Sequence, residues 1–320
     1  MADMRYRQLG RSGLTVSVVG LGCNNFRARC TDEEAYAVID AAIDEGITLF
    51  DTADIYGGGG GSEEVLGEHL GSRRADIVLT TKFGMPLPGG GPDARGSRRY
   101  IRRCVEASLR RLQTDWIDLY QYHAPDGITP MDETLEALDE LVLSGLVRYV
   151  GSSNFWAWQV AEAEHLARSH GTERYISAQN HYNLLSREIE AELVPACKAY
   201  GIGVLPYFPL ASGLLTGKYR RGEPAPAGTR MGGAPERFGS MLNDYNFERV
   251  EKLEALAAER GVTLLHVAMG GLAAQPTVDS VIAGATKPEQ VHANAEAGLW
   301  QPTPEDLAAI DAITPPSRPG

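Results

Sequence analysis

The stretch GITLFDTADIYGGGGGSEEVLG, residues 46–67, places ionisable side chains where an apolar segment meets five consecutive glycines. Residues 47–51 form a run of strand length, and the segment from Ser62 has the pattern of a helix. Because glycine is disfavoured inside packed elements, residues 57–61 are predicted to be a loop between the two. Asp51 and Tyr56 are therefore expected at the carboxyl end of a buried strand.

The same alternation of apolar runs and helical patterns extends along the chain. Helices are predicted by signals such as Thr31 as an N-cap with Glu34 three residues later. Each strand-like run is apolar almost throughout, which is typical of parallel strands covered on both faces. The strand-like runs are residues 18–22, 47–51, 76–82, 116–123, 147–154, 175–183, 202–208 and 279–285.

This pattern predicts a (β/α)8 TIM barrel over residues 1–320 as a single domain, preceded by a β-hairpin around Gly10 and Gly13. An open doubly wound sheet is the main alternative, since it has the same alternation. Residues 84–97 and 220–245 interrupt the repeat. Both follow strands, so in a barrel both are expected to be long loops at the C-terminal face.

Composition narrows the class of protein. The net charge is −12 in 320 residues, which argues against a nucleic-acid surface. The four cysteines form no CxxC pair, which favours free thiols in a reducing compartment. The first residues have no apolar signal-peptide core, and no run approaches the length of a membrane span. We expect a cytoplasmic protein without nucleic-acid or membrane partners, and its oligomeric state stays open.

The glycines match neither common nucleotide-binding motif. No glycine precedes Lys-Ser or Lys-Thr, as a Walker A loop requires. Gly20 and Gly22 form a GxG at the end of the first predicted strand, but Asn25 stands at the third glycine position of GxGxxG. A nicotinamide cofactor would therefore be held in another way.

Polar side chains end three successive predicted strands. Asp51, Lys82 and His123 are strand-end residues, and Tyr56 lies in the loop after Asp51. In a parallel barrel, neighbouring strands are about 5 Å apart, so these side chains are expected to converge. A lysine ammonium stabilises tyrosinate and lowers the tyrosine pKa, an aspartate orients the lysine, and a histidine can hydrogen-bond the same substrate oxygen. Such a set can protonate an oxygen that gains negative charge, as in carbonyl reduction.

Each of these residues also has a structural interpretation. Lys82 could form an ion pair with Asp51 or Asp54, and His123 could be a core histidine. A metal site built from Asp51, Asp54 and His123 is less favoured, because the histidines form no HxH or HxxxH pair and the lysine has no clear use there.

At this point the sequence resembles the aldo-keto reductase superfamily, in the branch of bacterial reductases and potassium-channel β subunits. The resemblance rests on FDTADIYGGGGGSEEVLG, LTTKFG, DLYQYHAPD, RYVGSSNF, AQNHYN, PYFPLASGLLTGKY and VIAGATKPEQVHAN. It implies a (β/α)8 barrel that binds NADPH or NADP+ across its C-terminal face, NADH being possible. It also implies that Tyr56 is the general acid, that Lys82 and Asp51 lower its pKa, and that His123 orients a small carbonyl substrate.

The resemblance also implies a cofactor site. The implied residues are Gly22, Cys23, Ser153, Asn154, Gln179, Tyr207, Phe208, Leu210, Ser212, Gly213, Lys218, Arg230, Gly284, Thr286, Lys287, Gln290 and Asn294. Of these, Tyr207 matches the aromatic residue that stacks on the nicotinamide ring. Three departures from the family pattern are Phe208 for serine, Gln290 for arginine and Ala293 for an acidic residue. Because Gln290 stands where some branches have arginine, NADH remains an alternative to NADPH.

The sequence gives less information on which residues line the substrate pocket. Asn24, Asn25 and Phe26 follow the first predicted strand, and Trp156 follows the fifth, so all four are candidates to line it. A packing or surface-loop role is an equal alternative for each. The resemblance as a whole implies NADPH-dependent reduction of aldehydes or ketones, and the alternative is an NADP(H)-binding regulatory or redox-sensing subunit with little turnover.

Overall fold

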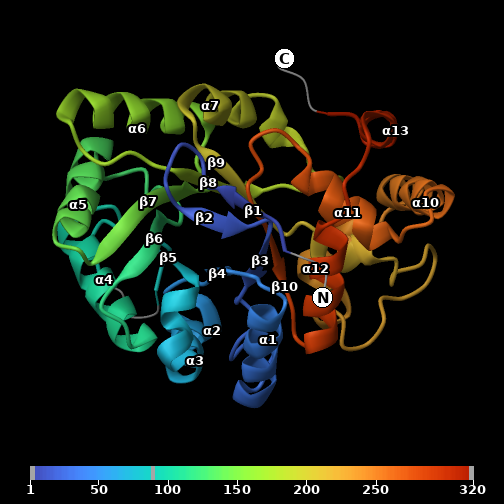
Figure 1. Ribbon diagram of the computed structural model, residues 1–320, viewed down its shortest axis with the longest axis horizontal. Coiled ribbons are helices and arrows are strands. Elements are labelled where there is room, and N and C mark those ends of the chain that lie inside the picture. Colours follow the sequence, from blue (N-terminus) through green and yellow to red (C-terminus); the bar gives the residue numbers. More distant parts are fainter. Residues whose placement is uncertain (1–3, 88–90, 317–320) are drawn as a thin grey trace.

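A computed structural model describes residues 4–87 and 91–316 and shows a barrel of eight parallel strands surrounded by helices (Figure 1). The strand order is β10-β3-β4-β5-β6-β7-β8-β9. The ring closes through Val204 of β9, whose N–H donates to the Thr277 carbonyl over 2.7 Å, just before β10. This closure excludes an open doubly wound sheet and confirms the predicted (β/α)8 barrel. The strands are β3 (Val19–Gly22), β4 (Leu49–Asp51), β5 (Val78–Phe83), β6 (Ile117–Tyr122), β7 (Val147–Ser153), β8 (Ser177–His181), β9 (Gly203–Tyr207) and β10 (Val281–Gly284).

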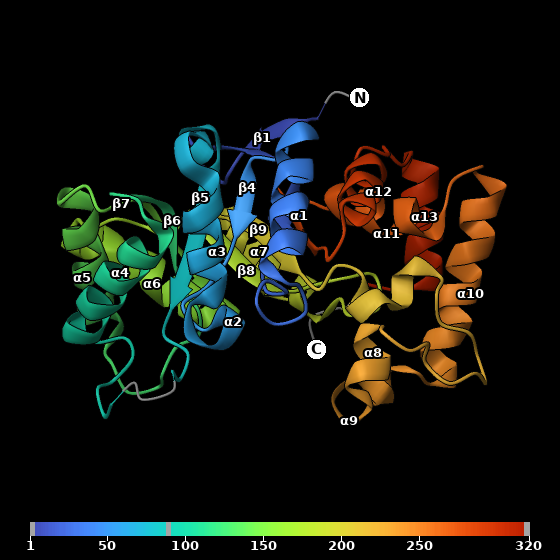
Figure 2. The ribbon, with the colours of Figure 1, turned by 90° about the horizontal axis from the view of Figure 1, so that it is seen from below.

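The predicted hairpin closes the amino-terminal end of the barrel. Strands β1 (Tyr6–Gln8) and β2 (Thr15–Ser17) pair antiparallel, with Tyr6 opposite Ser17. Leu9 and Val16 are fully buried and pack against an apolar layer inside the barrel. Figure 2 shows the hairpin at one end of the molecule and helices α8 and α9 at the opposite end. The amino-terminal end is thereby filled with apolar side chains, so the opposite end is the place for a site.

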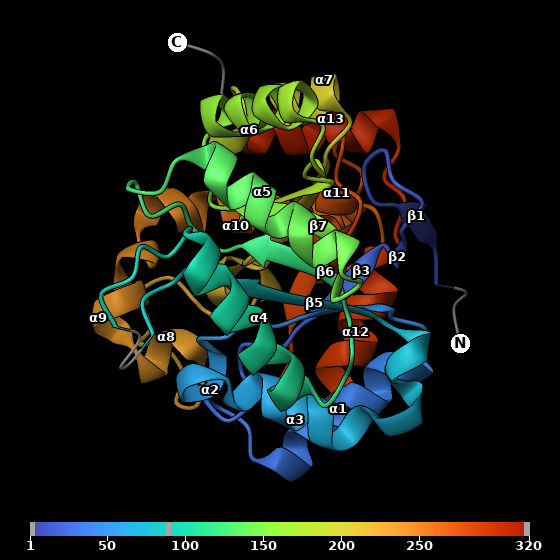
Figure 3. The ribbon, with the colours of Figure 1, turned by 90° about the vertical axis from the view of Figure 1, so that its left-hand side faces the viewer.

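Helices cover the outside of the barrel, as Figure 3 shows for α4, α5 and α6. Helix α1 begins where predicted, because the Thr31 hydroxyl accepts from Glu34 N–H and Glu34 caps Thr31 N–H in return. The helices are α1 (Asp32–Asp44), α2 (Tyr56–Gly59), α3 (Gly61–Leu70), α4 (Arg98–Leu112), α5 (Met131–Leu143), α6 (Ala157–His170), α7 (Leu193–Tyr200), α8 (Arg230–Gly233), α9 (Pro235–Phe238), α10 (Asp244–Glu259), α11 (Leu264–Ala273), α12 (Pro288–Gly298) and α13 (Pro304–Ile313). No helix of the described ranges is both long and apolar enough to cross a bilayer.

One predicted helix is shorter than expected. The sequence pattern of residues 186–201 by itself predicts a continuous helix, whereas the structure has a 3-10 turn, η2 (Glu188–Glu190), followed by α7. Pro195 explains the difference, since it is tolerated in the first turn of α7 but would break a helix that began at residue 186.

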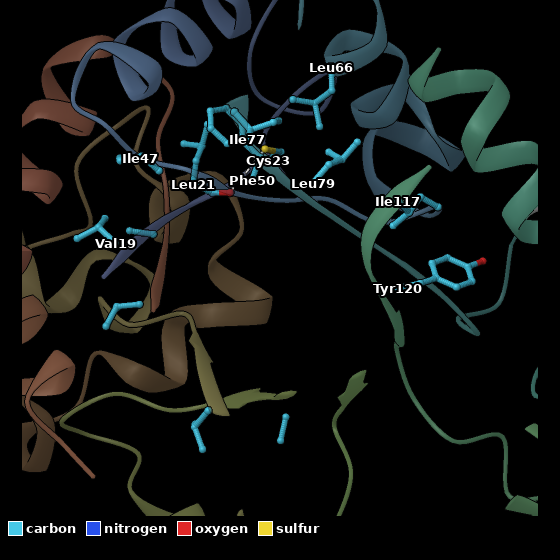
Figure 4. Packing of buried hydrophobic residues seen from close by; sticks show 14 of the residues in the cluster. Val19, Leu21, Cys23, Ile47, Phe50, Leu66, Ile77, Leu79, Ile117 and Tyr120 are labelled. Carbon is cyan, nitrogen blue, oxygen red and sulfur yellow. Dashed lines mark hydrogen bonds between the residues drawn. The ribbon is translucent and has the colours of Figure 1, made fainter. Parts of the chain in front are cut away.

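The core lies between the barrel wall and its helices. Figure 4 shows this packing around β3, β4, β5 and β6. Outward-facing strand residues such as Leu21, Phe50 and Leu79 are buried there against helical residues such as Leu66. Side chains along a strand point alternately outward and inward. Because Phe50 and Leu79 point outward, Asp51 and Lys82 point into the barrel, where both are buried at its carboxyl end.

The two interruptions of the repeat both follow strands at the carboxyl end of the barrel. The first is the loop after β5, of which residues 88–90 lie outside the described residues. The second follows β9 and η3 (Ala211–Thr216), and it carries α8, α9 and η4 (Gly239–Met241), which were not predicted within it. Both loops therefore border the open end of the barrel.

Candidate active site

The floor of the site is a buried ion pair. The Lys82 ammonium lies 2.7 Å from Asp51 Oδ2, and the side chains are 0% and 5% exposed. Lys82 also donates to the Thr52 carbonyl over 2.8 Å. The second oxygen of Asp51 accepts from the Gln179 amide over 2.7 Å. Adjacent strands β4 and β5 supply the pair, and Asp51 connects it to β8 across the barrel.

Tyr56 completes the arrangement that the sequence predicted. The Lys82 ammonium lies 5.0 Å from the centre of the Tyr56 ring, so the phenol faces a buried positive charge. Burial raises the pKa of Tyr56 above its ordinary value, and the nearby Lys82 charge opposes that rise. The net direction differs from the expected lowering, because desolvation of the phenol outweighs the ammonium in this pocket. Tyr56 is thus held fully protonated at neutral pH and is directed toward a cation.

His123 is the third group beside the phenol. Its ring stands edge-on to Tyr56 with centroids 5.8 Å apart. Burial and the Lys82 charge lower the pKa of His123 to about 3, so it is neutral at physiological pH. A neutral imidazole in this place can donate or accept one hydrogen bond to a substrate oxygen. The four predicted catalytic residues, Asp51, Tyr56, Lys82 and His123, therefore lie together.

The backbone conformation of this loop explains its run of glycines. Gly57 to Gly60 all have positive φ, the last at 109°, which side chains rarely tolerate. At Gly60 a Cβ would collide with the Arg111 guanidinium, and at Gly57 it would collide with the backbone N–H of Ser62. The run is therefore the tight turn that carries the chain from Tyr56 into α3, and Gly57 lines the cavity described next.

A cavity of about 1170 Å³ opens over these residues at the carboxyl end of the barrel. It is large enough for a dinucleotide and a small substrate together. The residues from the sequence-based expectations that line it are Asp51, Tyr56, His123, Gly22, Ser153, Asn154, Gln179, Tyr207, Phe208, Leu210, Ser212, Gly213, Lys218, Arg230, Gly284, Thr286, Lys287, Gln290, Asn294, Asn24 and Asn25.

Four expected residues lie elsewhere. Lys82 is fully buried within the floor and does not itself line the cavity. Cys23 and Phe26 are fully buried in the core between the barrel and its helices. Trp156 is 72% exposed at the start of α6 and does not line the cavity. The structure therefore does not place Cys23, Phe26 or Trp156 against a ligand, because their backbone positions turn the side chains inward or outward.

A hydrogen-bond chain spans the cavity wall above the ion pair. The Tyr207 hydroxyl donates to Asn154 Oδ1 over 2.7 Å, and the Asn154 amide donates to the His123 carbonyl over 2.9 Å. Asn154, Phe208 and Ser212 have positive φ although they are not glycines. Such backbone strain is concentrated at functional sites. Here it occurs in the loops after β7 and β9 that line the cavity.

Cations gather at one end of the cavity. Lys218, Arg29 and Arg230 all line it. Burial together with the charges of Arg29 and Arg230 lowers the pKa of Lys218. Arg230 also donates to Asn25 Oδ1 over 3.0 Å, and Arg29 donates to the Gly228 carbonyl over 3.1 Å. Positive side chains gathered at one end of the cavity would bind an anion such as a pyrophosphate, which would offset their mutual repulsion.

Arg29 was missed by the reasoning from sequence. It comes from the loop after β3, while Lys218 and Arg230 come from the loop after β9. The signal that could have found it is its position in a long loop at the carboxyl end of a strand. Met85, Ala124 and Leu265 also line the cavity without having been predicted.

The far end of the cavity is formed by the start of α12. Gln290 Oε1 accepts from the Thr286 N–H over 2.8 Å, which holds the turn before the helix. Lys287, the N-cap of α12, lies beside it. A helix start with a lysine is suited to a phosphate group. Among the residues that the structure describes, no three His, Cys, Asp or Glu side chains gather as metal ligands would.

Comparison with known proteins agrees with this geometry. The chain matches the model of the Aldo/keto reductase family over residues 18–315. It is 39% identical over 322 residues to the uncharacterized oxidoreductase YrpG of Bacillus subtilis strain 168, covering 98% of this chain and 96% of the relative. It is 38% identical over 322 residues to a probable voltage-gated potassium channel subunit beta of Oryza sativa subsp. japonica, covering 97% and 96%.

A fungal relative extends the comparison. The aldo-keto reductase dtxS3 of Metarhizium robertsii is 35% identical over 301 residues, which cover 83% of this chain and 80% of that protein. With the family model matching from the start of β3 to beyond the end of α13, the chain belongs to the aldo/keto reductase family.

Proposed function

We propose that this protein reduces aldehydes or ketones to alcohols with NADPH, and that Tyr56 is the general acid. The observation that carries the proposal is the Lys82 ammonium, buried between Asp51 and Tyr56 at the floor of the cavity. An ion pair placed there for stability alone would not need a tyrosine hydroxyl directed into a ligand-sized space.

In the proposed reaction the phenol gives its proton to the carbonyl oxygen as negative charge develops there. Lys82 stabilises the tyrosinate that results, and Asp51 keeps the ammonium in place. Neutral His123 donates a hydrogen bond that orients the carbonyl. General acid catalysis by one positioned group typically contributes 10²–10⁴-fold in rate.

The cavity fits the proposed cofactor. Tyr207 and the amides of Asn154 and Gln179 lie near Tyr56, where a nicotinamide would have to be held. The cluster of Arg29, Lys218 and Arg230 suits the pyrophosphate, and Thr286 with Lys287 suits the adenosine end. When bound, NADPH would supply the hydride. We further propose a cytoplasmic location, which the free and buried Cys23, Cys30, Cys104 and Cys197 support.

A second candidate function is an NADP(H)-binding regulatory or redox-sensing subunit. It is favoured by the similarity to the potassium-channel β subunit from rice, which extends over nearly the whole chain. Because the same four polar residues would occupy the floor in either case, turnover separates the candidates.

The test is steady-state oxidation of NADPH by the purified protein with a panel of aldehydes and ketones. We expect substrate-dependent oxidation on at least one class of carbonyl. Tight NADPH binding without turnover on any member of the panel would favour the regulatory subunit instead.

A further inference from the structure

A buried polar cluster lies on the outer side of the barrel wall, behind the catalytic residues. It is formed by Asp54 in the loop after β4, Glu63 of α3, Thr81 of β5 and Arg111 of α4. Asp54 and Glu63 are 1% and 0% exposed. None of these side chains has a role in the reaction proposed above, so their burial needs a separate explanation.

The charges in this cluster do not balance. One oxygen of Glu63 accepts from the Thr81 hydroxyl over 2.5 Å, and the other is paired with Arg111 over 2.6 Å. Asp54 has no comparable partner, since neither of its oxygens accepts a hydrogen bond from a side chain of the described residues. Two buried acids thus lie near one guanidinium, whose side chain is 21% exposed, and an unpaired carboxylate at a buried position is very costly.

The groups around Asp54 favour its neutral form. Burial and the charge of Glu63 raise the pKa of Asp54 to about 8, against the weaker opposing charges of Arg111 and Lys82. Tyr100, Cys104 and Tyr120, from α4 and β6, complete its surroundings. All three have pKa values raised by burial, so they remain uncharged as well.

Asp54 is attached directly to the catalytic residues. Its backbone N–H donates to the Lys82 carbonyl over 3.1 Å, and it precedes Tyr56 by two residues in the same loop. The Lys82 ammonium already donates to Asp51 Oδ2 and the Thr52 carbonyl, and it lies 5.0 Å from the centre of the Tyr56 ring. A new anion at Asp54 would attract that ammonium and make Tyr56 a weaker acid.

We propose that Asp54 is a positioning residue that must be protonated for Lys82 and Tyr56 to work as a pair. In this role the Asp54 carboxyl is neutral during catalysis. Its deprotonation, on the outer side of the barrel wall, weakens the interaction between Lys82 and Tyr56. The proposal rests on the proposed function, because it concerns the same Tyr56.

Other groups near Tyr56 titrate outside the range in which this effect is expected. The pKa of His123 is lowered to about 3, whereas those of Tyr56 and Lys82 are raised above 10 and 10.5. Cys104, whose thiol interacts electrostatically with Asp54, has a pKa raised to about 12. A change in kcat between pH 7 and 9 would therefore report on Asp54.

The experiment compares wild type with Asp54→Asn, whose amide has the shape of the neutral acid and cannot ionise. kcat for NADPH oxidation is measured from pH 6 to 9.5 in the same buffers for both, together with the thermal unfolding midpoint without cofactor. Asp44→Asn is the matched control, since it makes the same chemical change at an exposed position on α1.

We expect the ratio of kcat for Asp54→Asn to kcat for wild type to rise about tenfold between pH 7 and 9, following a single ionisation near pH 8. The unfolding midpoint of Asp54→Asn should also exceed that of wild type by a margin that grows between pH 5 and 8. A ratio that stays flat, or an Asp54→Asn protein that is less stable than wild type at pH 8 or does not fold, would overturn the proposal. If wild type reduces no carbonyl at all, the proposed function fails, and the unfolding midpoints still decide whether Asp54 is neutral.

Discussion

Lys82 and Asp51 are joined over 2.7 Å where neither side chain has appreciable contact with solvent. Removing one partner leaves the other as an uncompensated buried charge, at a cost of about 3–5 kcal/mol. We therefore expect Lys82→Met and Asp51→Asn each to lower the free energy of unfolding by about that amount. Urea titration of both single variants and of the double variant measures it.

The double variant separates stability from catalysis. It should lose less stability than the sum of the two single changes, because no unpaired charge remains. It should nevertheless stay inactive in carbonyl reduction, since Tyr56 has lost its cation. Strictly additive losses would show that the two side chains do not depend on each other as the 2.7 Å contact indicates.

Tyr56→Phe tests the proposed acid with the smallest possible change. Only the hydroxyl is removed, so the ring beside His123 and the cavity shape remain. We expect carbonyl reduction to fall by at least 10²-fold, in line with the loss of a general acid, while the Kd for NADPH changes less than threefold. Fluorescence titration with NADPH gives the second value. Loss of activity and binding together would contradict the assigned role.

Arg29→Ala tests the cationic end of the cavity. Arg29 lies with Lys218 and Arg230, and burial plus these like charges lowers the pKa of Lys218. Removal of one cation should weaken NADPH binding about tenfold, or about 1.4 kcal/mol, and reduce its dependence on salt. The matched control is Arg102→Ala, an exposed arginine of α4 paired with Glu106, for which we expect no change. Equal effects of both substitutions would mean that only net charge matters.

His123 should make folding sensitive to acid. Its pKa is about 3 in the folded protein and about 6.5 when unfolded, so below pH 6.5 the unfolded state binds the extra proton. Stability is thus complete above pH 6.5 and is lost as the pH falls toward 3. His123→Gln removes this term, so the wild-type unfolding midpoint should decline relative to that of the variant between pH 7 and 5. A constant difference between the two would show that His123 is not buried in its neutral form.

The arrangement of the floor of the site could be predicted because it depends on strand register. Asp51, Lys82 and His123 end or follow neighbouring strands, and parallel strands bring such positions together in any barrel. The direction of the Tyr56 pKa could not be predicted, because it depends on how deeply the phenol is desolvated. The sequence shows which ionisable groups are present, but only the folded structure shows how far each of them is desolvated.

The loops account for the remaining differences. Phe26 and Trp156 both follow strands that end at the cavity, yet one is buried in the core and the other is exposed. Arg29 reaches the cavity from the same loop as Phe26. The direction of a loop side chain depends on backbone angles such as the positive φ of Arg27, which no periodic pattern specifies.

Gln290→Arg tests the preference between NADPH and NADH. Gln290 holds the turn before α12 through the Thr286 N–H and lies in the cavity beside Lys287. An arginine there adds a second cation for a 2′-phosphate, so we expect the ratio of the NADH Kd to the NADPH Kd to rise about tenfold. Gln290→Leu is the matched control, because it loses the same turn contact without adding charge and should weaken both cofactors alike. If the arginine variant also weakens both alike, the adenosine phosphate does not lie at this end of the cavity.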